Sequence, residues 1–375
     1  MIYLDNAATT KMSDTAIDAM QSCMNEMYGN PSGIYHIGRI AKESMENARR
    51  SIAESIGARA ENIFFTSGGT EADNWVLGNA KQFGKHIITS KIEHHAILNK
   101  CAVLEKEGMD VSYIEPDGYG MVAAEKVRNE IRNDTALISV MYANNEIGTI
   151  EPVSSIAAIA HENNVLFHTD AVQAAGHVPI NVEEMNVDFL SASGHKFHGP
   201  KGVGFLYVRE PEKITPFLHG GGQEKRKRAG TENVAGIVGM SAALKEAANQ
   251  MEWRIKKESE MRSYLIGRVL SEIPYVRLNG SIVKRLPGNA NFSFCGINGT
   301  SLVILMDNDE ICISAGSACS SGSDKPSHVI TAIGVPEELA YGTVRITISS
   351  ENTMDEINYV ISRLKENVSK LRREK

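Results

Sequence analysis

The sequence has no excess of positive charge and no long hydrophobic run. Its 375 residues include 39 Lys and Arg against 46 Asp and Glu, so the formal net charge is −7. An acidic chain has no general attraction to nucleic-acid phosphates, which argues against direct nucleic-acid binding. No apolar run approaches the roughly 18 residues of a membrane-spanning helix, and no signal-peptide pattern follows Met1. We therefore expect a cytoplasmic protein without a membrane or nucleic-acid partner.

Cysteine is scarce, and the five cysteines form no C-x-x-C pair. They are Cys23, Cys101, Cys295, Cys312 and Cys319. An odd, scattered set argues against a disulfide framework and a structural zinc site, and it agrees with a reducing compartment. Cys319 differs from the others because residues 314–323 are almost all small or polar, which favours a mobile loop. The other four cysteines fit small hydrophobic packing positions.

Two common motifs of catalysis and nucleotide binding are also missing. No P-loop occurs, because its nearest approach at 78–85 has the wrong spacing and no hydroxyl after the lysine. No G-x-S-x-G nucleophile elbow occurs, so the His-Gly-Gly-Gly run at 219–222 does not indicate an α/β hydrolase.

The sequence does contain short β-branched runs that alternate with helical stretches. The runs at 62–65, 86–89, 136–140, 165–168 and 187–190 are continuous and apolar, which is typical of a parallel sheet buried on both faces. Beyond residue 250 this simple alternation stops, which suggests a separate α+β domain. There we expect a charged helix over 253–270 and a final helix that begins with a capping box at 353–356. We place the domain boundary near residue 255.

Polar groups follow three of the expected strands, where open parallel sheets bind ligands. The turn 67–70 is either an ordinary helix cap, with Asp73 completing a capping box, or an anion site at a helix N-terminus. Asp170 taken alone is more typical of a helix cap. Lys196 follows a small, flexible turn that suits a Schiff-base lysine, whereas Lys201 is typical of a solvated one. Pyridoxal phosphate needs an anion site, an acid and an amine, so the three turns together predict this cofactor.

Eight motifs resemble, in the same order, those of class V aminotransferase-fold cysteine desulfurases of the NifS/IscS type. They lie at 3–10, 67–74, 144–148, 168–173, 193–196, 219–224, 229–233 and 317–319. The resemblance implies an α/β chain with the fold type I of pyridoxal-phosphate enzymes. A large domain over 15–255 would hold a mostly parallel, seven-stranded sheet. A smaller α+β domain over 1–14 and 256–375 would carry Cys319, and two chains would form a homodimer.

The resemblance also implies roles around the cofactor ring. Lys196 would hold the aldehyde of pyridoxal phosphate and later shuttle protons. Asp170 would pair with the pyridine nitrogen, and Gln173 would bond the phenolic oxygen. His94, otherwise a satisfied turn histidine, would stack on the ring and take part in proton transfer. Asn145 would contact both cofactor and substrate.

Further roles follow for the phosphate and the substrate. The phosphate would be held by Gly69, Thr70, Ser193 and His195. Thr231 would reach the same phosphate from the neighbouring subunit. Arg345 would bind the substrate carboxylate, because its planar fork matches two oxygens.

Cys319 decides which reaction the resemblance implies. The substrate would be L-cysteine, the products L-alanine and a persulfide on Cys319. The acceptor of the sulfur would be an iron–sulfur scaffold protein or a tRNA-thiolation enzyme. We expect no stable metal site, only a transient iron–sulfur contact of Cys319 through its persulfide.

Other functions agree less well with these residues. A selenocysteine lyase remains open, whereas an aminotransferase would not require a thiol on a flexible loop. A sulfur-relay scaffold without catalysis would not need Lys196, Asp170 and Cys319. Two features depart from the family pattern: no second arginine follows Arg345 in the run 346–350, and the chain ends at Lys375 without a longer tail. Our hypothesis is that scaffold docking uses another surface, or that the acceptor is a tRNA-thiolation enzyme.

Overall fold

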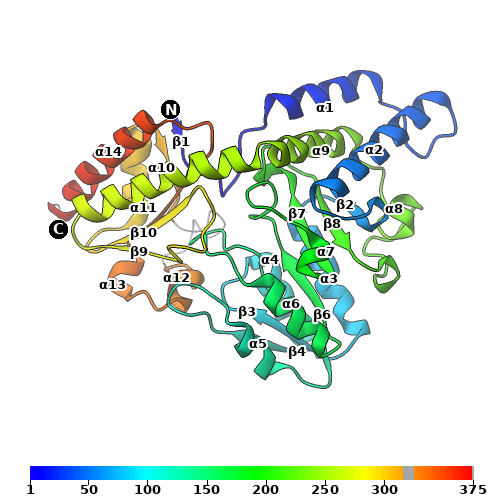
Figure 1. Ribbon diagram of the computed structural model, residues 1–375, viewed down its shortest axis with the longest axis horizontal. Coiled ribbons are helices and arrows are strands. Elements are labelled where there is room, and N and C mark those ends of the chain that lie inside the picture. The colour runs from blue at the N-terminus through cyan, green and yellow to red at the C-terminus, as the bar shows by residue number, and fades with distance from the viewer. Residues whose placement is uncertain (316–324, 374–375) are drawn as a thin grey trace.

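The computed structural model describes residues 1–315 and 325–373. Figure 1 shows a large sheet enclosed by helices and a smaller group of strands and helices beside it, with both chain ends at the smaller group. The helices α9 and α10 lead from the first group to the second.

The large sheet has seven strands in the order β2-β8-β7-β6-β5-β3-β4. In that order they are Ile63–Thr66, Gly204–Val208, Phe189–Ser193, Leu166–Asp170, Thr135–Ser139, His86–Ser90 and Asp110–Ile114. Only the two pairings of β8, with β2 and with β7, are antiparallel. The predicted large, mostly parallel sheet is thus confirmed, and six strands end at one edge.

Alternate residues of these strands enter two different cores, because successive side chains of a strand point to opposite faces. Phe65 and Leu190 pack with α2 (His36–Ser55), α6 (Val153–Glu162) and α9 (Val234–Asn249) on one face. Phe64 and Phe189 pack with α3 (Gly69–Asn79) and α4 (His95–Lys106) on the other. Both faces are therefore covered, which explains the continuous apolar runs.

The helices of this part precede residue 250. They are α1 (Asp14–Glu26), α2 (His36–Ser55), α3 (Gly69–Asn79), α4 (His95–Lys106), α5 (Ala124–Glu130), α6 (Val153–Glu162), α7 (Val182–Met185), α8 (Gln223–Arg226) and α9 (Val234–Asn249). Short 3-10 turns are η1 (Ala60–Asn62), η2 (Ala80–Gln82), η3 (Gly194–Lys196) and η4 (Pro211–Lys213).

The second group has its own hydrophobic core. Its strands are β1 (Ile2–Tyr3), β9 (Val276–Leu278), β10 (Asn289–Phe294), β11 (Ile311–Cys312) and β12 (Thr343–Thr347). Its helices are α10 (Met251–Glu272), α11 (Gly299–Asn308), α12 (His328–Ala332), α13 (Glu337–Ala340) and α14 (Met354–Arg373). The core joins Leu4 to apolar residues between 261 and 368. Residue 255 lies inside α10, and the division 15–255 against 1–14 and 256–375 stays a prediction.

Two strands extend further than the hydrophobic pattern predicts. β6 continues to Asp170 and β7 to Ser193, so both residues end a strand instead of lying in a turn. The extension of β7 pairs Ser191 and Ser193 with Leu206 and Gly204 of β8. Small polar side chains can occupy a buried strand where partners satisfy them, which hydropathy alone does not reveal. Among the helices described, none is long and apolar enough to cross a membrane.

Candidate active site

A cavity of about 260 Å³ opens at the carboxyl ends of the large sheet's strands. It brings together all the predicted site residues except Thr231 and Cys319. These are Gly69, Thr70, His94, Asn145, Asp170, Gln173, Ser193, His195, Lys196 and Arg345. Sequence reasoning did not place Ala7, Ala8, Asp73, Met141 and Val172 here, although they line the same cavity.

The amine of the site belongs to Lys196, in the 3-10 turn that follows β7. Its Nζ donates to the carbonyls of Ala7 at 2.8 Å and Ala8 at 2.7 Å. The N-terminal segment thus forms one wall of the cavity. Lys201, a few residues along, is exposed, as a solvated lysine should be.

The acid of the site is Asp170, which is buried at the end of β6. Its Oδ1 accepts the N–H of Val172 at 2.9 Å, and turns rather than a helix follow it. Asp170 is therefore not the helix cap that its own segment suggested. Burial raises the pKa of Asp170 to about 6, while the Val172 N–H and the Lys196 charge oppose that rise. A cationic hydrogen-bond donor in the cavity would stabilise this carboxylate.

A second buried carboxyl, Asp73, lies in the same wall. Burial and the charge of Asp170 raise its pKa, and its Oδ1 accepts no hydrogen bond from any described residue. His168 lies behind it, with Nε2 3.7 Å from Asp73 Oδ1 and 3.0 Å from Ser191 Oγ. The i, i+3 spacing from Thr70 places Asp73 one helical turn further on the same face of α3. That spacing could have identified Asp73, which sequence reasoning considered only as part of a cap.

The start of α3 has the geometry that suits an anion. The helix starts at Gly69, its N-cap is Gly68, and no side chain caps it, so the capping-box alternative at Thr70 was wrong. A Cβ at position 69 would lie 2.4 Å from Val172 Cγ2, so this close approach requires glycine. Open backbone N–H groups at a helix N-terminus bind anions. The hydroxyls of Thr70 and Ser193 line the same cavity.

These groups fit pyridoxal phosphate. The glycine cradle and the start of α3 suit a phosphate, Asp170 suits a protonated ring nitrogen, and Lys196 suits an aldehyde. His195 lines the cavity too, with its Nδ1 3.1 Å from the Thr9 hydroxyl. Gln173 donates its amide to the carbonyl of Ala7 at 2.9 Å.

His94 caps α4 with its side chain. Its Nδ1 accepts the N–H of Ala96 at 3.1 Å, which assigns the proton of the neutral ring to Nε2. Burial lowers the pKa of His94 to about 4, with further lowering by Lys196, His95 and His328. The ring is therefore neutral at physiological pH.

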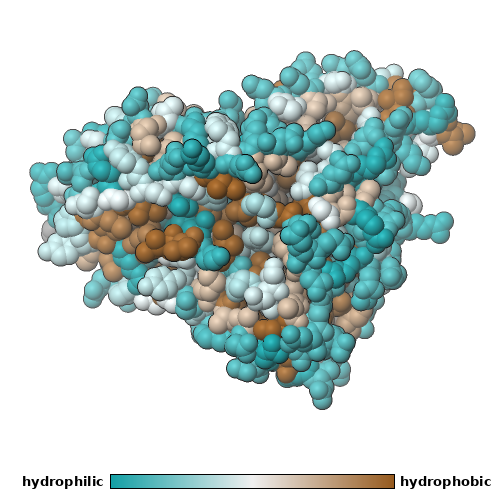
Figure 2. All heavy atoms as spheres, viewed as in Figure 1, coloured by the Kyte–Doolittle hydropathy of each residue, from teal (hydrophilic) through white to brown (hydrophobic). Residues whose placement is uncertain are grey.

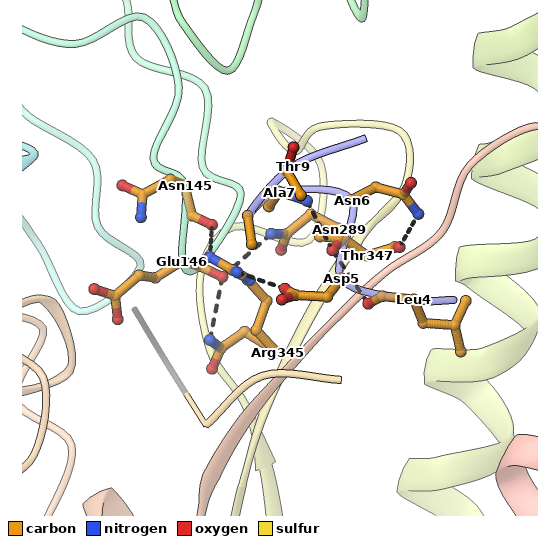
Figure 3. A network of polar contacts seen from close by, with 12 residues as sticks. Leu4, Asp5, Asn6, Ala7, Thr9, Asn145, Glu146, Asn289, Arg345 and Thr347 are labelled. Atoms are coloured by element: carbon orange, nitrogen blue, oxygen red, sulfur yellow. Dashed lines mark hydrogen bonds and ion pairs between the residues drawn. The ribbon is translucent and has the colours of Figure 1, made fainter. Parts of the chain in front are cut away.

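The Arg345 side chain, from β12, lies between the N-terminal segment and the loop after β5 (Figure 3). Its Nη2 donates to Asp5 Oδ1 at 2.7 Å, and its Nη1 donates to the backbone carbonyl of Asn145 at 2.9 Å. The guanidinium is almost fully buried, and its Nε has no hydrogen-bond partner among residues 1–315 and 325–373. Backbone hydrogen bonds between Arg345 and Ser314 join it to the chain that follows β11. Asp5, which sequence reasoning did not single out, is therefore its counter-ion.

Thr231 does not line this cavity in the single chain. Thr231 is exposed between α8 and α9. Cys319 lies outside the described residues. Within the described part of the chain, no group of three His, Cys, Asp or Glu side chains could hold a metal ion.

Comparisons with known proteins give a consistent result over the whole chain. Residues 2–360 match the family described as aminotransferase class-V. A cysteine desulfurase IscS of Dictyoglomus turgidum is 48% identical over 99% of this chain and 95% of its own length. Another, of Methanosarcina thermophila, is 49% identical over 99% and 93%. Among solved structures, a NifS-like protein has a TM-score of 0.93 and 37% identity, covering 98% of this chain and 99% of that one.

Proposed function

This chain belongs to the class V aminotransferase family and is a pyridoxal-phosphate-dependent cysteine desulfurase; on that premise, we propose how its cavity performs the reaction. The observation that carries the proposal is the convergence of Lys196, Asp170 and the start of α3 on one cavity. Each group alone has an ordinary structural explanation. Amine, acid and anion site together match the three parts of the cofactor.

The cavity residues hold the cofactor and move protons. Pyridoxal phosphate, when bound, supplies an electron sink for a carbanion at the substrate Cα. The Lys196 amine would hold the aldehyde and carry the Cα proton. The Asp170 carboxylate would pair with the protonated ring nitrogen, and the Gln173 amide would bond the phenolic oxygen. Because Ala96 occupies Nδ1 of His94, proton exchange with a bound molecule takes place at its Nε2.

Arg345 and Asn145 bind the substrate. We assign the carboxylate of L-cysteine to the Arg345 guanidinium, because this residue lines the cavity and its planar fork matches two carboxylate oxygens. Asp5 and the Asn145 carbonyl hold the guanidinium from other directions. A fixed fork of this kind orients the substrate for reaction.

Cys319 receives the sulfur in this proposal. Its thiolate attacks the substrate sulfur, the Cβ–S bond breaks, and its electron pair stays with the carbon skeleton. A proton delivered to Cβ completes the methyl group of alanine, and Cys319 keeps a persulfide. The balance is one cysteine and one thiol giving one alanine and one persulfide. The role of Cys319 is supported by its sequence motif. Ser314, five residues before it in the sequence, exchanges backbone hydrogen bonds with Arg345, which lines the cavity.

Mass spectrometry of the protein after addition of cysteine tests this assignment. We expect one added sulfur atom on Cys319 and release of alanine. Cys319→Ser should keep the visible absorbance of the bound cofactor but form no persulfide. Cys295→Ser, which changes a partly exposed cysteine elsewhere, serves as the control. Undiminished sulfide release by Cys319→Ser would show that another group takes the sulfur.

Further parts of the proposal concern partners and location. Two copies form a dimer in which Thr231 of one reaches the phosphate in the other. The sulfur passes to an iron–sulfur scaffold or a tRNA-thiolation enzyme, where the persulfide contacts a nascent cluster only transiently. Binding assays with each purified acceptor distinguish the two. The four described cysteines are free thiols, which agrees with action in the reducing cytoplasm.

A further inference from the structure

A projecting segment over residues 215–233, here called the arm, lies outside the cavity just described. Backbone hydrogen bonds close its base, from Phe217 N to Lys227 O at 3.0 Å and from Ala229 N to Leu218 O at 3.2 Å. Figure 1 shows its helix α8 at the edge of the large sheet, beside β2 and β8. Residues 219–222 and 230–231 are exposed. The arm therefore presents glycines and Thr231 to the outside.

A buried ion pair anchors the arm to the sheet. The Glu224 carboxylate accepts hydrogen bonds from Arg49 at 2.7 and 2.9 Å and from the Phe65 N–H of β2 at 2.8 Å. Both side chains are almost fully buried. Glu224 and the next two residues, Lys225 and Arg226, have φ angles of 44°, 57° and 67°. Three successive left-handed residues without a glycine are strained, and such strain persists only where the surroundings enforce it.

A second ion pair joins the arm to the anion site. Arg228 donates from Nε and Nη2 to the two carboxylate oxygens of Glu71, at 2.8 and 3.0 Å. Glu71 also accepts the N–H of Ser67 at 2.8 Å. Burial raises the pKa of Glu71, but the hydrogen bonds from Arg228 and Ser67 outweigh it and lower the pKa overall. The Glu71 carboxylate is thus bound by Arg228 of the arm and by Ser67 of the turn 67–70, here called the phosphate turn.

Glu71 directly follows Thr70, and Arg228 lies three residues before Thr231. We infer that the Glu71–Arg228 pair couples the two active sites of the dimer, so that the phosphate turn of one subunit sets the position of Thr231 in its partner's cavity. The inference rests on the proposed function, which places Thr231 in the partner. Glu71 and Arg228 are positioning residues, since neither lines the cavity. Because coupling between two binding sites is reciprocal, cofactor binding in either cavity should strengthen cofactor binding in the other.

Mixed dimers test the coupling. The reporter subunit has the natural sequence and shows the visible absorbance of bound cofactor. The tester subunit carries Lys196→Ala, so that it contributes no such band, together with one further substitution. The two are tagged differently, purified together and diluted into an excess of a cofactor-trapping protein. The measured quantity is the rate at which the reporter loses pyridoxal phosphate.

Thr231→Ala in the tester should raise that rate about tenfold, because a hydroxyl-to-phosphate hydrogen bond is charge-assisted. Glu71→Gln or Arg228→Gln in the tester should raise it several-fold, and the double substitution no further than either alone. Arg226→Gln removes an exposed charge from the same arm and should change the rate less than twofold.

The outcomes separate the inference from the proposed function. A Thr231→Ala effect without a Glu71→Gln or Arg228→Gln effect overturns the coupling and leaves the dimer assignment intact. No effect of Thr231→Ala overturns both. If one ion-pair variant fails to fold, the other decides the question, because each removes the same contact. An equal effect of Arg226→Gln overturns the coupling, since net charge would then explain the result.

Discussion

At the scale of single residues, burial decides which protonation states the cavity presents. Asp170 in the cavity and Glu93 outside its lining are buried carboxyls with pKa values raised to about 6 and about 8. His94 and His195 are imidazoles with pKa values lowered by burial to about 4. The site therefore offers neutral rings and carboxyls whose charge depends on what binds beside them.

The proposed role of Lys196 predicts that its substitution affects cofactor binding and turnover, whereas substitution of Lys201 does not. Lys196→Ala should lose the visible band of bound cofactor and at least about 10³-fold of turnover, because no other described amine lines the cavity. Absorbance spectra and alanine release measure both. Lys201→Ala, an exposed lysine near the same turn, should leave both unchanged. A cofactor band of full intensity in Lys196→Ala would contradict the assignment.

Glu93 should make stability depend on pH. Burial mainly raises its pKa from 4.5 to about 8, so the folded state keeps a proton that the unfolded state releases. Stability from this group is complete below pH 4.5 and is lost as the pH rises through about 8. Glu93→Gln mimics the protonated group. Its free energy of unfolding should therefore rise relative to the natural protein by about 2 kcal/mol between pH 6 and 8.

Denaturant unfolding at the two pH values measures this difference. Glu260→Gln, at an exposed position of α10, should follow the pH profile of the natural protein. Parallel profiles of Glu93→Gln and the natural protein would show that Glu93 is charged in the folded state.

At the scale of elements, a sequence motif predicted a helix start correctly where its side chains bond to backbone N–H groups within the motif itself. The capping box of α14 is confirmed: the Thr353 hydroxyl accepts the Glu356 N–H at 3.2 Å, and the Glu356 carboxylate accepts the Thr353 N–H at 2.9 Å. The similar pattern from Thr70 to Asp73 was wrong. There the N-cap is Gly68, two residues before Thr70, and Asp73 is buried in the cavity wall instead.

Removing the α14 cap should cost stability without affecting chemistry. Thr353→Ala leaves the Glu356 N–H without its acceptor and should lower the free energy of unfolding by about 1 kcal/mol. The melting temperature should fall by about 2 °C. Thr353→Ser keeps the hydroxyl and should have the melting temperature of the natural protein. Equal losses in both variants would mean that packing of the methyl group, not the cap, matters.

At the scale of the whole molecule, the proposed dimer needs a face for the second copy, and we predict that face from exposed apolar residues. Figure 2 shows hydrophobic residues at the tip of the loop between α1 and α2. Tyr28, Ile34 and Tyr35 are exposed there, Ile34 by 90%. Exposed apolar and aromatic side chains close together in sequence are a candidate protein interface.

Sedimentation tests this dimer face. The natural protein should sediment at twice its chain mass of 40.9 kDa. Ile34→Asp places a charge in the interface and should shift the protein toward monomers. Val283→Asp, at an equally apolar position that is 84% exposed in the second group, should remain dimeric. Dimers of undiminished stability in Ile34→Asp would place the interface elsewhere.

The sequence by itself determined the alternating strands, the separate C-terminal core and the amine, acid and anion groups of the cavity. These depend on hydrophobic periodicity and on groups placed directly after strands, which are local properties. Only the tertiary structure decided three pairings of charged groups. Asp5 pairs with Arg345, and Arg228 pairs with Glu71. Asp73 lies close enough to Asp170 for the charge of Asp170 to raise its pKa. The partners in each pair are distant in sequence. A buried charge needs a compensating neighbour, and no local sequence pattern specifies which residue that neighbour is.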